Sequence, residues 1–227
     1  MKISVLTGAG ISAESGIATF RGAGGLWEGH RVEDVASPEG WLRDPAMVLQ
    51  FYNERRKAVS KAKPNKAHVD IAALQEQHSV TVITQNIDDL HERAGSKNII
   101  HLHGEIFKSR SSKNESLIYP CEGDIHLGDL AADGSQLRPH IVWFGEMVPM
   151  IEKAAEIVGN TDMVVIIGTS MVVYPAASLL HYAAYDVPIW VINPEIPPIT
   201  GRSNIHYIQK NATEGVAEWI KSLQVGT

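Results

Sequence analysis

The sequence predicts an α/β protein with a Rossmann-like, doubly wound parallel sheet and a small second domain. Short runs of β-branched and apolar residues alternate with longer amphipathic segments, which is typical of a parallel sheet connected by helices. Most of these runs are apolar at every position, as expected for strands that helices cover on both faces. Two long stretches interrupt the alternation, and such stretches usually carry function or form a satellite module.

The hydrophobic pattern places the individual elements. Strands are expected at Ile3–Leu6, Val80–Thr84, Ile99–Leu102, Ile141–Phe144, Met163–Ile167, Ile189–Ile192 and Ile205–Ile208. Helices are expected at residues 45–60, 66–77, 151–159, 175–184 and 213–223. In the last helix Thr213 is a candidate N-cap, because its hydroxyl can accept a hydrogen bond from a free amide of the first turn.

The two interruptions predict the domain organisation. Residues 28–63 contain a helical segment, and residues 106–140 are polar and rich in Asp, Gly and Ser. We expect these two inserts to meet and form the small domain. Residues 1–27, 64–105 and 141–227 would then form the Rossmann-like domain.

Composition excludes several classes of protein. The chain has 227 residues, of which 44% are hydrophobic and 20% are charged, a balance that supports a sizeable core. The net charge of −6 and the scattered basic residues argue against nucleic-acid binding, and no apolar run is long enough for a membrane span. One cysteine, Cys121, excludes an internal disulfide and a multi-thiolate metal site. Lys2–Leu6 does not resemble a signal peptide, so we expect a cytoplasmic protein.

A glycine-rich turn, residues 7–12, follows the first strand. Gly8 and Gly10 permit a tight turn in which backbone N–H groups approach a phosphate, although a plain strand–helix turn would have the same composition. A dehydrogenase also needs an acidic residue about 20 positions further on, at the end of a second strand. Glu33 and Asp34 have that spacing, but the glycine-rich residues before them cannot form a buried strand. The pattern therefore disfavours hydride transfer.

Polar side chains follow two further predicted strands. His103 lies just past Ile99–Leu102, and Gln85, Asn86 and Asp88 follow Val80–Thr84. Open α/β sheets bind ligands at the carboxyl edge of their strands, and histidine is the usual general base near neutral pH. An amide and a carboxylate at this edge suit ribose hydroxyls and a carboxamide. The plainer alternative is a strand-end histidine bonded to a backbone carbonyl.

Five ordered segments resemble the sirtuin family of NAD-dependent protein deacylases, and the resemblance extends over essentially the whole chain. These segments are residues 8–12, Ala18–Arg21, Thr84–Asp88, His101–Gly104 and Val142–Glu146. Gly168–Ser170, Pro175 and Asn193–Glu195 extend the similarity toward the C-terminus. Within the family, the sequence is most similar to bacterial deacylases that prefer acidic acyl groups.

The resemblance implies NAD as co-substrate and acylated lysines of proteins as partners. In the implied reaction nicotinamide leaves the anomeric carbon, the acyl oxygen attacks that carbon, and His103 deprotonates a ribose hydroxyl. Asp88 would bond the nicotinamide amide, Phe20 would shield the reactive carbon, and Arg21 would lie near the phosphates. The implied NAD-binding residues are Gly8, Ala9, Gly10, Ile11, Ser12, Glu14, Ser15, Ala18, Thr19, Phe20, Arg21, Trp27, Gln85, Asn86, Ile87, Asp88, Gly168, Thr169, Ser170, Asn193, Pro194, Glu195 and Ala212.

The segment Val142, Trp143, Phe144, Gly145 and Glu146 is the implied site for the acyl-lysine and its peptide, which would pair as an added strand. Trp143 and Phe144 have a plainer interpretation as core aromatics. Glu146 is also expected to be partly structural.

Tyr52 and Arg55 lie three residues apart on one face of the predicted helix 45–60. A guanidinium and a phenol that point together form a carboxylate receptor. This Tyr-x-x-Arg pair resembles the pair in sirtuins that remove succinyl and malonyl groups. On spacing alone, a solvated helix face containing Arg56 and Lys57 is the alternative. The position within the family pattern favours acyl recognition.

Most sirtuins hold a structural zinc through cysteines in the segment that corresponds to residues 106–140. Here Ser111 and Ser112 stand near the place of the first cysteine, and Cys121 with His126 provides too few ligands. We therefore expect no zinc. The module would instead be held by packing of its apolar residues, Leu117, Ile118, Tyr119, Ile125, Leu127 and Leu130.

Three other functions stay open at this point. The chain could be a reader of NAD or ADP-ribose, an ADP-ribosyl transferase that uses the same cleavage step, or, least favoured, a dehydrogenase. His103 together with Asn86 and Asp88 argues against a reader, because binding alone needs no general base.

Overall fold

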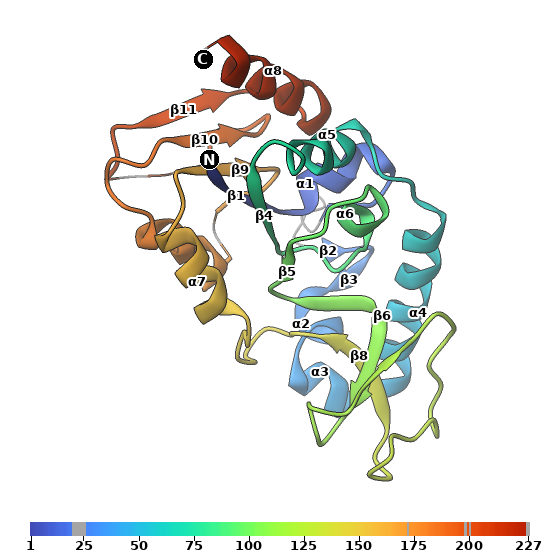
Figure 1. The fold of residues 1–227 in the computed structure, drawn as a ribbon. Helices are drawn as coiled ribbons and strands as arrows, with labels where there is room; N and C mark the ends of the chain where they lie inside the picture. Colours follow the sequence, from blue (N-terminus) through green and yellow to red (C-terminus); the bar gives the residue numbers. More distant parts are fainter. Residues whose placement is uncertain (20–25, 172, 198, 200, 226–227) are drawn as a thin grey trace.

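A six-stranded, fully parallel sheet forms the centre of the structure, a computed structural model that describes residues 1–19, 26–171, 173–197, 199 and 201–225 (Figure 1). Its strands follow the order β11-β10-β9-β1-β4-β5. This is the strand order of dinucleotide-binding folds. The chain adds strands on one side of β1 as far as β5, and then adds β9, β10 and β11 on the other side, so the strand order reverses between β1 and β9. The strands are β1 (Lys2–Thr7), β4 (Ser79–Thr84), β5 (Ile99–His101), β9 (Met163–Ile167), β10 (Ile189–Ile192) and β11 (Ile205–Ile208).

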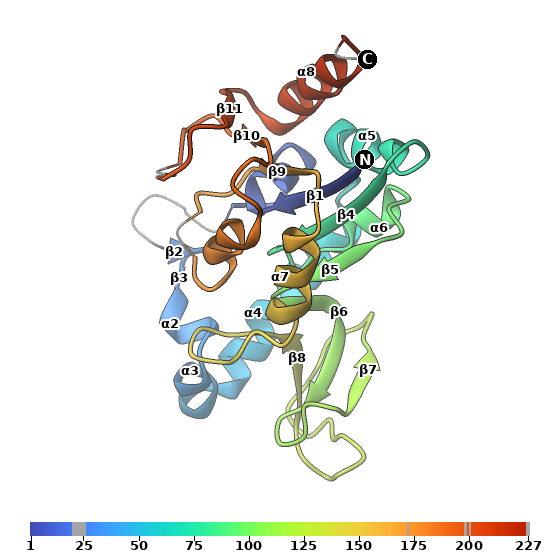
Figure 2. The same cartoon turned by 60° about the vertical axis from the view of Figure 1, so that its left-hand side comes forward.

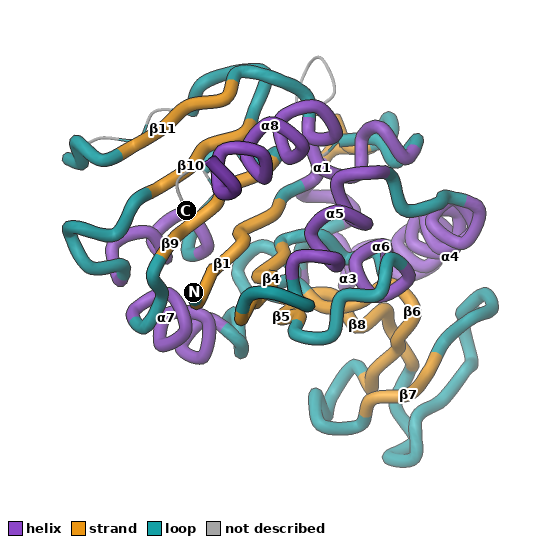
Figure 3. The backbone as a smooth tube through the Cα atoms, turned by 45° about the horizontal axis from the view of Figure 1, so that its top comes forward, coloured by secondary structure: helices purple, strands orange, loops and turns teal. Residues whose placement is uncertain are grey.

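Helices bury both faces of this sheet (Figure 3). On one face Val5 and Val165 pack with residues of α5 (Lys66–Leu74) and α8 (Ala212–Val225). On the other face the alternate residues Leu6 and Ile166 pack with α7 (Ile151–Gly159) and the 3₁₀ helix η2 (Ala176–Tyr182). Burial on both sides explains why the strands are apolar at every position. Short helical turns follow β1 and β4, namely α1 (Ala9–Ser12), η1 (Ala13–Ser15) and α6 (Leu90–Arg93).

A smaller antiparallel sheet lies at the opposite end of the molecule from α8 (Figure 2). Its strands β6 (Gly104–Ser111), β7 (Ile118–Pro120) and β8 (Leu137–Ile141) have the order β7-β6-β8. Helix α4 (Pro45–Lys61) packs against it, preceded by β2 (Leu26–Trp27), β3 (His30–Arg31), α2 (Val32–Val35) and α3 (Pro38–Arg43). Most of these residues fall within the two interruptions of the strand–helix pattern, although β2 lies before the first. The exact domain boundaries at 28–63 and 106–140 stay a prediction.

Three expected elements differ from the structure. The expected strand Ile141–Phe144 is wrong, because β8 ends at Ile141 and belongs to the antiparallel sheet. Residues 175–184 contain the 3₁₀ helix η2 in place of an α-helix. Thr213 is not an N-cap, because α8 begins at Ala212 and the carboxylate of Glu14 accepts hydrogen bonds from both the amide and the hydroxyl of Thr213.

Hydrogen bonds, more than apolar packing, hold residues 106–140 together. Of the apolar residues expected to form a core there, Ile125 is buried, whereas Ile118, Leu127 and Leu130 are exposed. The buried hydroxyl of Ser111 lies 2.7 Å from a carboxylate oxygen of Asp133 and 2.7 Å from the hydroxyl of Ser135. The expectation of an apolar core in this segment was therefore wrong.

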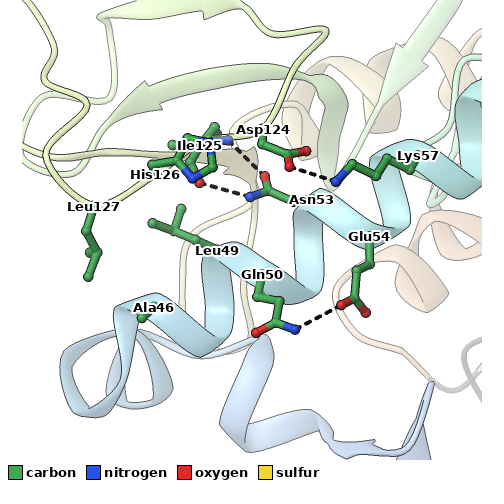
Figure 4. A pocket seen from close by; sticks show the side chains of 10 residues that line it. All are labelled: Ala46, Leu49, Gln50, Asn53, Glu54, Lys57, Asp124, Ile125, His126 and Leu127. Atoms are coloured by element: carbon green, nitrogen blue, oxygen red, sulfur yellow. Dashed lines mark hydrogen bonds and ion pairs between the residues drawn. The ribbon is translucent and has the colours of Figure 1, made fainter.

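Helix α4 supplies further polar anchors to the same segment. The side chain of Asn53 exchanges two hydrogen bonds of 2.9 Å with the backbone of Ile125, and Lys57 pairs with Asp124 beside a groove of about 470 Å³ (Figure 4). Arg56, whose side chain is almost fully buried, donates to the carbonyl of Ile106. Interpreting Arg56 as part of a solvated face was therefore wrong.

Within the described residues, none of the helices has the length and the apolar character that a membrane crossing requires.

Candidate active site

A cavity of about 640 Å³ opens at the carboxyl ends of β1, β4 and β9, and extends to the small antiparallel region. The loops that follow these strands line it, together with side chains of α4 and the turn after β8. This is the position where the strand order reverses, and where open α/β sheets bind their ligands. Its volume is in the range of binding sites for cofactors and drug-sized ligands.

The cavity brings together nearly all of the predicted site residues. Those that line it are Gly8, Ala9, Gly10, Ser12, Glu14, Ala18, Thr19, Trp27, Tyr52, Arg55, Gln85, Asn86, Ile87, Asp88, His103, Val142, Trp143, Phe144, Gly145, Glu146, Gly168, Thr169, Ser170, Asn193, Pro194, Glu195 and Ala212. Two do not line it: Ile11 is buried in the core, and the hydroxyl of Ser15 accepts a hydrogen bond from Asn65. The predicted residues Phe20 and Arg21 lie outside the described residues.

The glycines of the first turn allow two loops to meet. The amide of Gly8 donates to the carbonyl of Ile167 (3.0 Å), and the amide of Gly10 donates to the carbonyl of Gly168 (2.8 Å). A Cβ atom on Gly10 would lie 2.6 Å from the Cα of Gly168, which has a φ of 62°. Glycine is needed here for close approach. The amides of Gly8 and Gly10 are therefore bonded within the protein, and the predicted approach of a phosphate to this turn stays a prediction.

A hydrogen-bonded chain joins three polar side chains at the base of the cavity. The hydroxyl of Ser12 donates to Asp88 Oδ2 (3.0 Å) and accepts from Asn86 Nδ2 (3.1 Å). Asp88 Oδ1 accepts from the amide of Leu90 at 3.2 Å. Burial raises the pKa of the Asp88 carboxyl, although the bonds from Leu90 and Ser12 oppose this shift. A fixed carboxylate, hydroxyl and amide can bind a carboxamide and sugar hydroxyls.

His103 has the geometry of a general base. Its Nδ1 lies 3.1 Å from the carbonyl of Gln85, an arrangement in which Nδ1–H donates and Nε2 keeps a lone pair. Burial lowers the pKa of His103, so the imidazole is neutral at pH 7. Gln85 is held in turn by a bond from its Nε2 to Thr169 Oγ1 at 3.1 Å. The plainer interpretation, a bond to a backbone carbonyl, is therefore correct and is compatible with a base.

A second histidine supports the same loop, and sequence reasoning did not assign it a role. His101 Nδ1 lies 3.2 Å from the carbonyl of Asn86, and its Nε2 lies 2.6 Å from Glu92 Oε1. Burial lowers the pKa of His101, but the hydrogen bond and the charge of Glu92 outweigh it and the pKa is raised. The two histidines thus bind consecutive carbonyls of the loop that carries Gln85 and Asn86.

At the other end of the cavity lie Tyr52 and Arg55. The hydroxyl of Tyr52 accepts a hydrogen bond from Trp143 Nε1 at 3.1 Å, so its own hydrogen can be donated to a ligand. The Arg55 guanidinium lies 4.6 Å from the centre of the Trp27 ring and 3.1 Å from Glu28 Oε1. Burial raises the pKa of Tyr52 and lowers that of Arg55, while Glu28 supports the charge of Arg55. The pair is buried, which contradicts the solvated-face alternative.

In the turn after β8, some residues line the cavity and others hold the turn in place. Trp143 is buried in the core and also lines the cavity. Glu146 accepts hydrogen bonds from Arg138 (2.7 Å), Arg110 (3.1 Å) and the amide of Trp143 (2.8 Å). Phe144 is half exposed at the cavity. Glu146 therefore holds the turn in place, and its two arginine partners were not predicted.

Several cavity residues were missed because they carry no chemical signal in the sequence. They are Ala13, Ile17, Ala36, Val59, Ile141, Val148, Val173, Tyr174, Pro175, Ile192 and Asn211. Most are apolar and are indistinguishable from core residues without the fold. Pro175 belongs to a family segment but had no assigned role.

One group of side chains among the described residues has the geometry of a metal site. Glu92, His101 and Glu105 place their ligand atoms within 4.8 Å of one another. The carboxylate of Glu92 already pairs with His101, and Glu105 pairs with Lys108 at 2.7 Å. The charges in this group are thus balanced within the protein. The group lies outside residues 106–140, the segment in which sirtuin zinc ligands are expected.

Comparison with known proteins identifies the family. Residues 8–175 match the Sir2 family. The chain is 51% identical to a protein from Helicobacter pylori strain J99 over 96% of its length (94% of the relative), and 54% identical to one from Bacteroides thetaiotaomicron over 94% of both chains. Both relatives are named NAD-dependent protein deacylase.

Solved structures agree with this assignment. A Sir2 homologue in complex with NAD is 40% identical and superposes with a TM-score of 0.87, over 99% of this chain and 90% of the other. A Sir2 variant with a deacetylated p53 peptide and 3′-O-acetyl ADP-ribose is 31% identical, with a TM-score of 0.83 over 97% of this chain and 92% of the other. The chain therefore belongs to the Sir2 family.

Proposed function

We propose that this Sir2-family enzyme is an NAD-dependent deacylase that removes succinyl and malonyl groups, as well as acetyl groups, from lysine side chains of proteins. The products would be free lysine, nicotinamide and O-acyl-ADP-ribose. One observation carries the proposal: a neutral His103 and the buried Tyr52–Arg55 pair line the same cavity. The names of the relatives support the general activity.

The polar end of the cavity fits NAD, whose nicotinamide–ribose bond supplies the electrophilic carbon. Asp88, held by Ser12 and Leu90, would orient the carboxamide, and Asn86 would orient the ribose. The buried carboxylate of Asp88 keeps lone pairs that its protein partners do not use, and these can accept a hydrogen bond from the carboxamide N–H. We assign Thr169 and Ser170 to the phosphate side, and Asn193, Glu195 and Ala212 to the adenosine side.

His103 would take the proton from a ribose hydroxyl. Because Nδ1–H is bonded to Gln85, only Nε2 is available as the acceptor. The lowered pKa keeps that nitrogen unprotonated at neutral pH. General bases of this kind contribute about 10²–10⁴-fold to a rate.

Tyr52 and Arg55 would recognise the carboxylate at the end of a succinyl or malonyl group. The Arg55 side chain is 8% exposed and its guanidinium lies over the Trp27 and Phe51 rings, where an unpaired ligand carboxylate would be costly. Arg55 supplies the opposite charge, and Tyr52 adds a neutral hydrogen bond. An acetyl group lacks the carboxylate but is smaller and would enter the same end of the cavity, so deacetylation should persist.

We also propose that the small region needs no zinc and that the enzyme acts in the cytoplasm. The hydrogen bonds among Ser111, Asp133 and Ser135 support the first point, because they link the chain segments where a metal would otherwise bind. The bonds from Asn53 and Arg56 add a second, metal-independent connection.

Mass spectrometry of acylated peptides incubated with NAD tests the proposal. Conversion of succinyl, malonyl and acetyl peptides to free lysine, with the matching acyl-ADP-ribose, is the expected result. A peptide that gains the mass of ADP-ribose would indicate a transferase, and an unchanged peptide with bound NAD would indicate a reader. Either result would contradict a deacylase.

A further inference from the structure

We infer that Glu28 is a built-in competitor of the substrate's acyl carboxylate for Arg55, and that it sets the preference between acidic and neutral acyl groups. This inference rests on the proposed role of Arg55 in carboxylate recognition. Glu28 would pair with Arg55 while the acyl end is empty or holds an acetyl group. A succinyl or malonyl carboxylate would take its place.

The contact between the two side chains is asymmetric. Arg55 Nη1 lies 3.1 Å from Glu28 Oε1, but the Arg55 side chain is 8% exposed and that of Glu28 is 48% exposed. Arg55 lines the cavity, whereas Glu28 reaches the guanidinium from outside the lining. The buried Nε of Arg55 has no hydrogen-bond partner among the described residues. The guanidinium is thus only partly satisfied by Glu28, which leaves it able to exchange that partner for a carboxylate in the cavity.

The backbone conformation at Glu28 is one that glutamate rarely adopts. Glu28 and Gly29 form the two-residue turn between β2 and β3, in which Trp27 pairs with His30. Their φ angles are 50° and 83°, as in a turn that favours Asn-Gly or Asp-Gly. A longer side chain such as Glu is disfavoured at a positive φ. The local turn therefore does not explain the glutamate, whereas the ion pair with Arg55 does.

Exchange of carboxylates follows from the burial of the two partners. A buried guanidinium needs a counter-charge, and Glu28 provides one that reaches in from solvent. When a ligand carboxylate binds Arg55, Glu28 can turn back into water at low cost because half of it is already exposed. An ion pair with one exposed partner contributes up to about 1 kcal/mol, which corresponds to about fivefold in binding.

The test compares E28Q, which removes the charge, with wild type on paired succinyl and acetyl peptides. We expect the succinyl-to-acetyl ratio of kcat/KM to rise about fivefold, through a lower KM for the succinyl peptide. E28N removes the same charge and suits the turn, so it should give the same change even if E28Q folds poorly. E33Q is the matched control, since Glu33 is exposed, pairs with Arg31 nearby and does not line the cavity.

Two results would overturn the inference. One is an unchanged ratio in both E28Q and E28N, and the other is an equal rise in E33Q, which would show a general charge effect. R55M, measured in parallel, separates this inference from the proposed function. If R55M loses desuccinylation selectively while E28Q and E28N change nothing, only the competition by Glu28 fails. If R55M loses both activities equally, carboxylate recognition by Arg55 fails as well.

Discussion

Replacing Arg55 by methionine removes the charge that the proposed acyl recognition requires. The methionine side chain can still pack on Trp27 and Phe51, over which the guanidinium now lies, so the change mainly deletes the charge. A hydrogen bond to a charged group contributes about 2–3 kcal/mol, or about 30- to 150-fold. Desuccinylation should fall by that factor in kcat/KM, and deacetylation should fall far less, because an acetyl group offers Arg55 no carboxylate.

The assay is kcat/KM for paired succinyl and acetyl peptides of one sequence. Lys57→Met is the matched control, since it removes a cation from the same helix at an exposed position that pairs with Asp124. It should leave the ratio of the two activities as in wild type. An equal fall of both activities in Arg55→Met would show that Arg55 is structural, and would refute the assignment of acidic acyl groups.

Four further predictions concern other parts of the molecule. Tyr52→Phe should lower desuccinylation by about 1 kcal/mol, a smaller selective loss than that of Arg55→Met; an equal loss of deacetylation would argue against it. His103→Ala should reduce turnover about 10²–10⁴-fold while calorimetry still detects NAD binding, and near-wild-type turnover would exclude His103 as the base. The purified chain should contain well below one zinc per chain by elemental analysis, and a chelator should leave its Tm unchanged; stoichiometric zinc would contradict the zinc-free proposal. Burial lowers the pKa of His68 to about 4, so below about pH 6.5 the unfolded chain binds more protons than the folded chain. The free energy of unfolding should therefore fall by up to about 3 kcal/mol between pH 6.5 and pH 4, which urea titrations at several pH values can measure.

Elements with a strong apolar pattern were predictable from the sequence. Six of the seven expected strands belong to the parallel sheet, because continuous apolar runs such as Met163–Ile167 have no other favourable environment. The strand β6 (Gly104–Ser111) was missed because most of its residues are polar. It is the central strand of the small antiparallel sheet, which has little apolar core, so it shows no clear apolar pattern. Ile141 was apolar enough to suggest a strand, but the pattern could not reveal that its partner is antiparallel.

The candidate site was predictable where residue type alone indicates chemistry. His103, Asp88 and Asn86 follow strand ends, and the fold brings them into one cavity. The structural role of Arg56 was not predictable, because Arg56 resembles a surface residue in sequence and is buried through a bond to Ile106, far along the chain. The ion pair between Glu28 and Arg55 was missed for the same reason.

The most direct test of the account is an internal competition. Equimolar succinyl-lysine and acetyl-lysine peptides are incubated in one reaction with NAD and the enzyme, and all products are followed by mass spectrometry. The account predicts that both peptides are converted to free lysine and that O-succinyl-ADP-ribose forms alongside O-acetyl-ADP-ribose. Formation of O-acetyl-ADP-ribose alone, with the succinyl peptide intact, would contradict it.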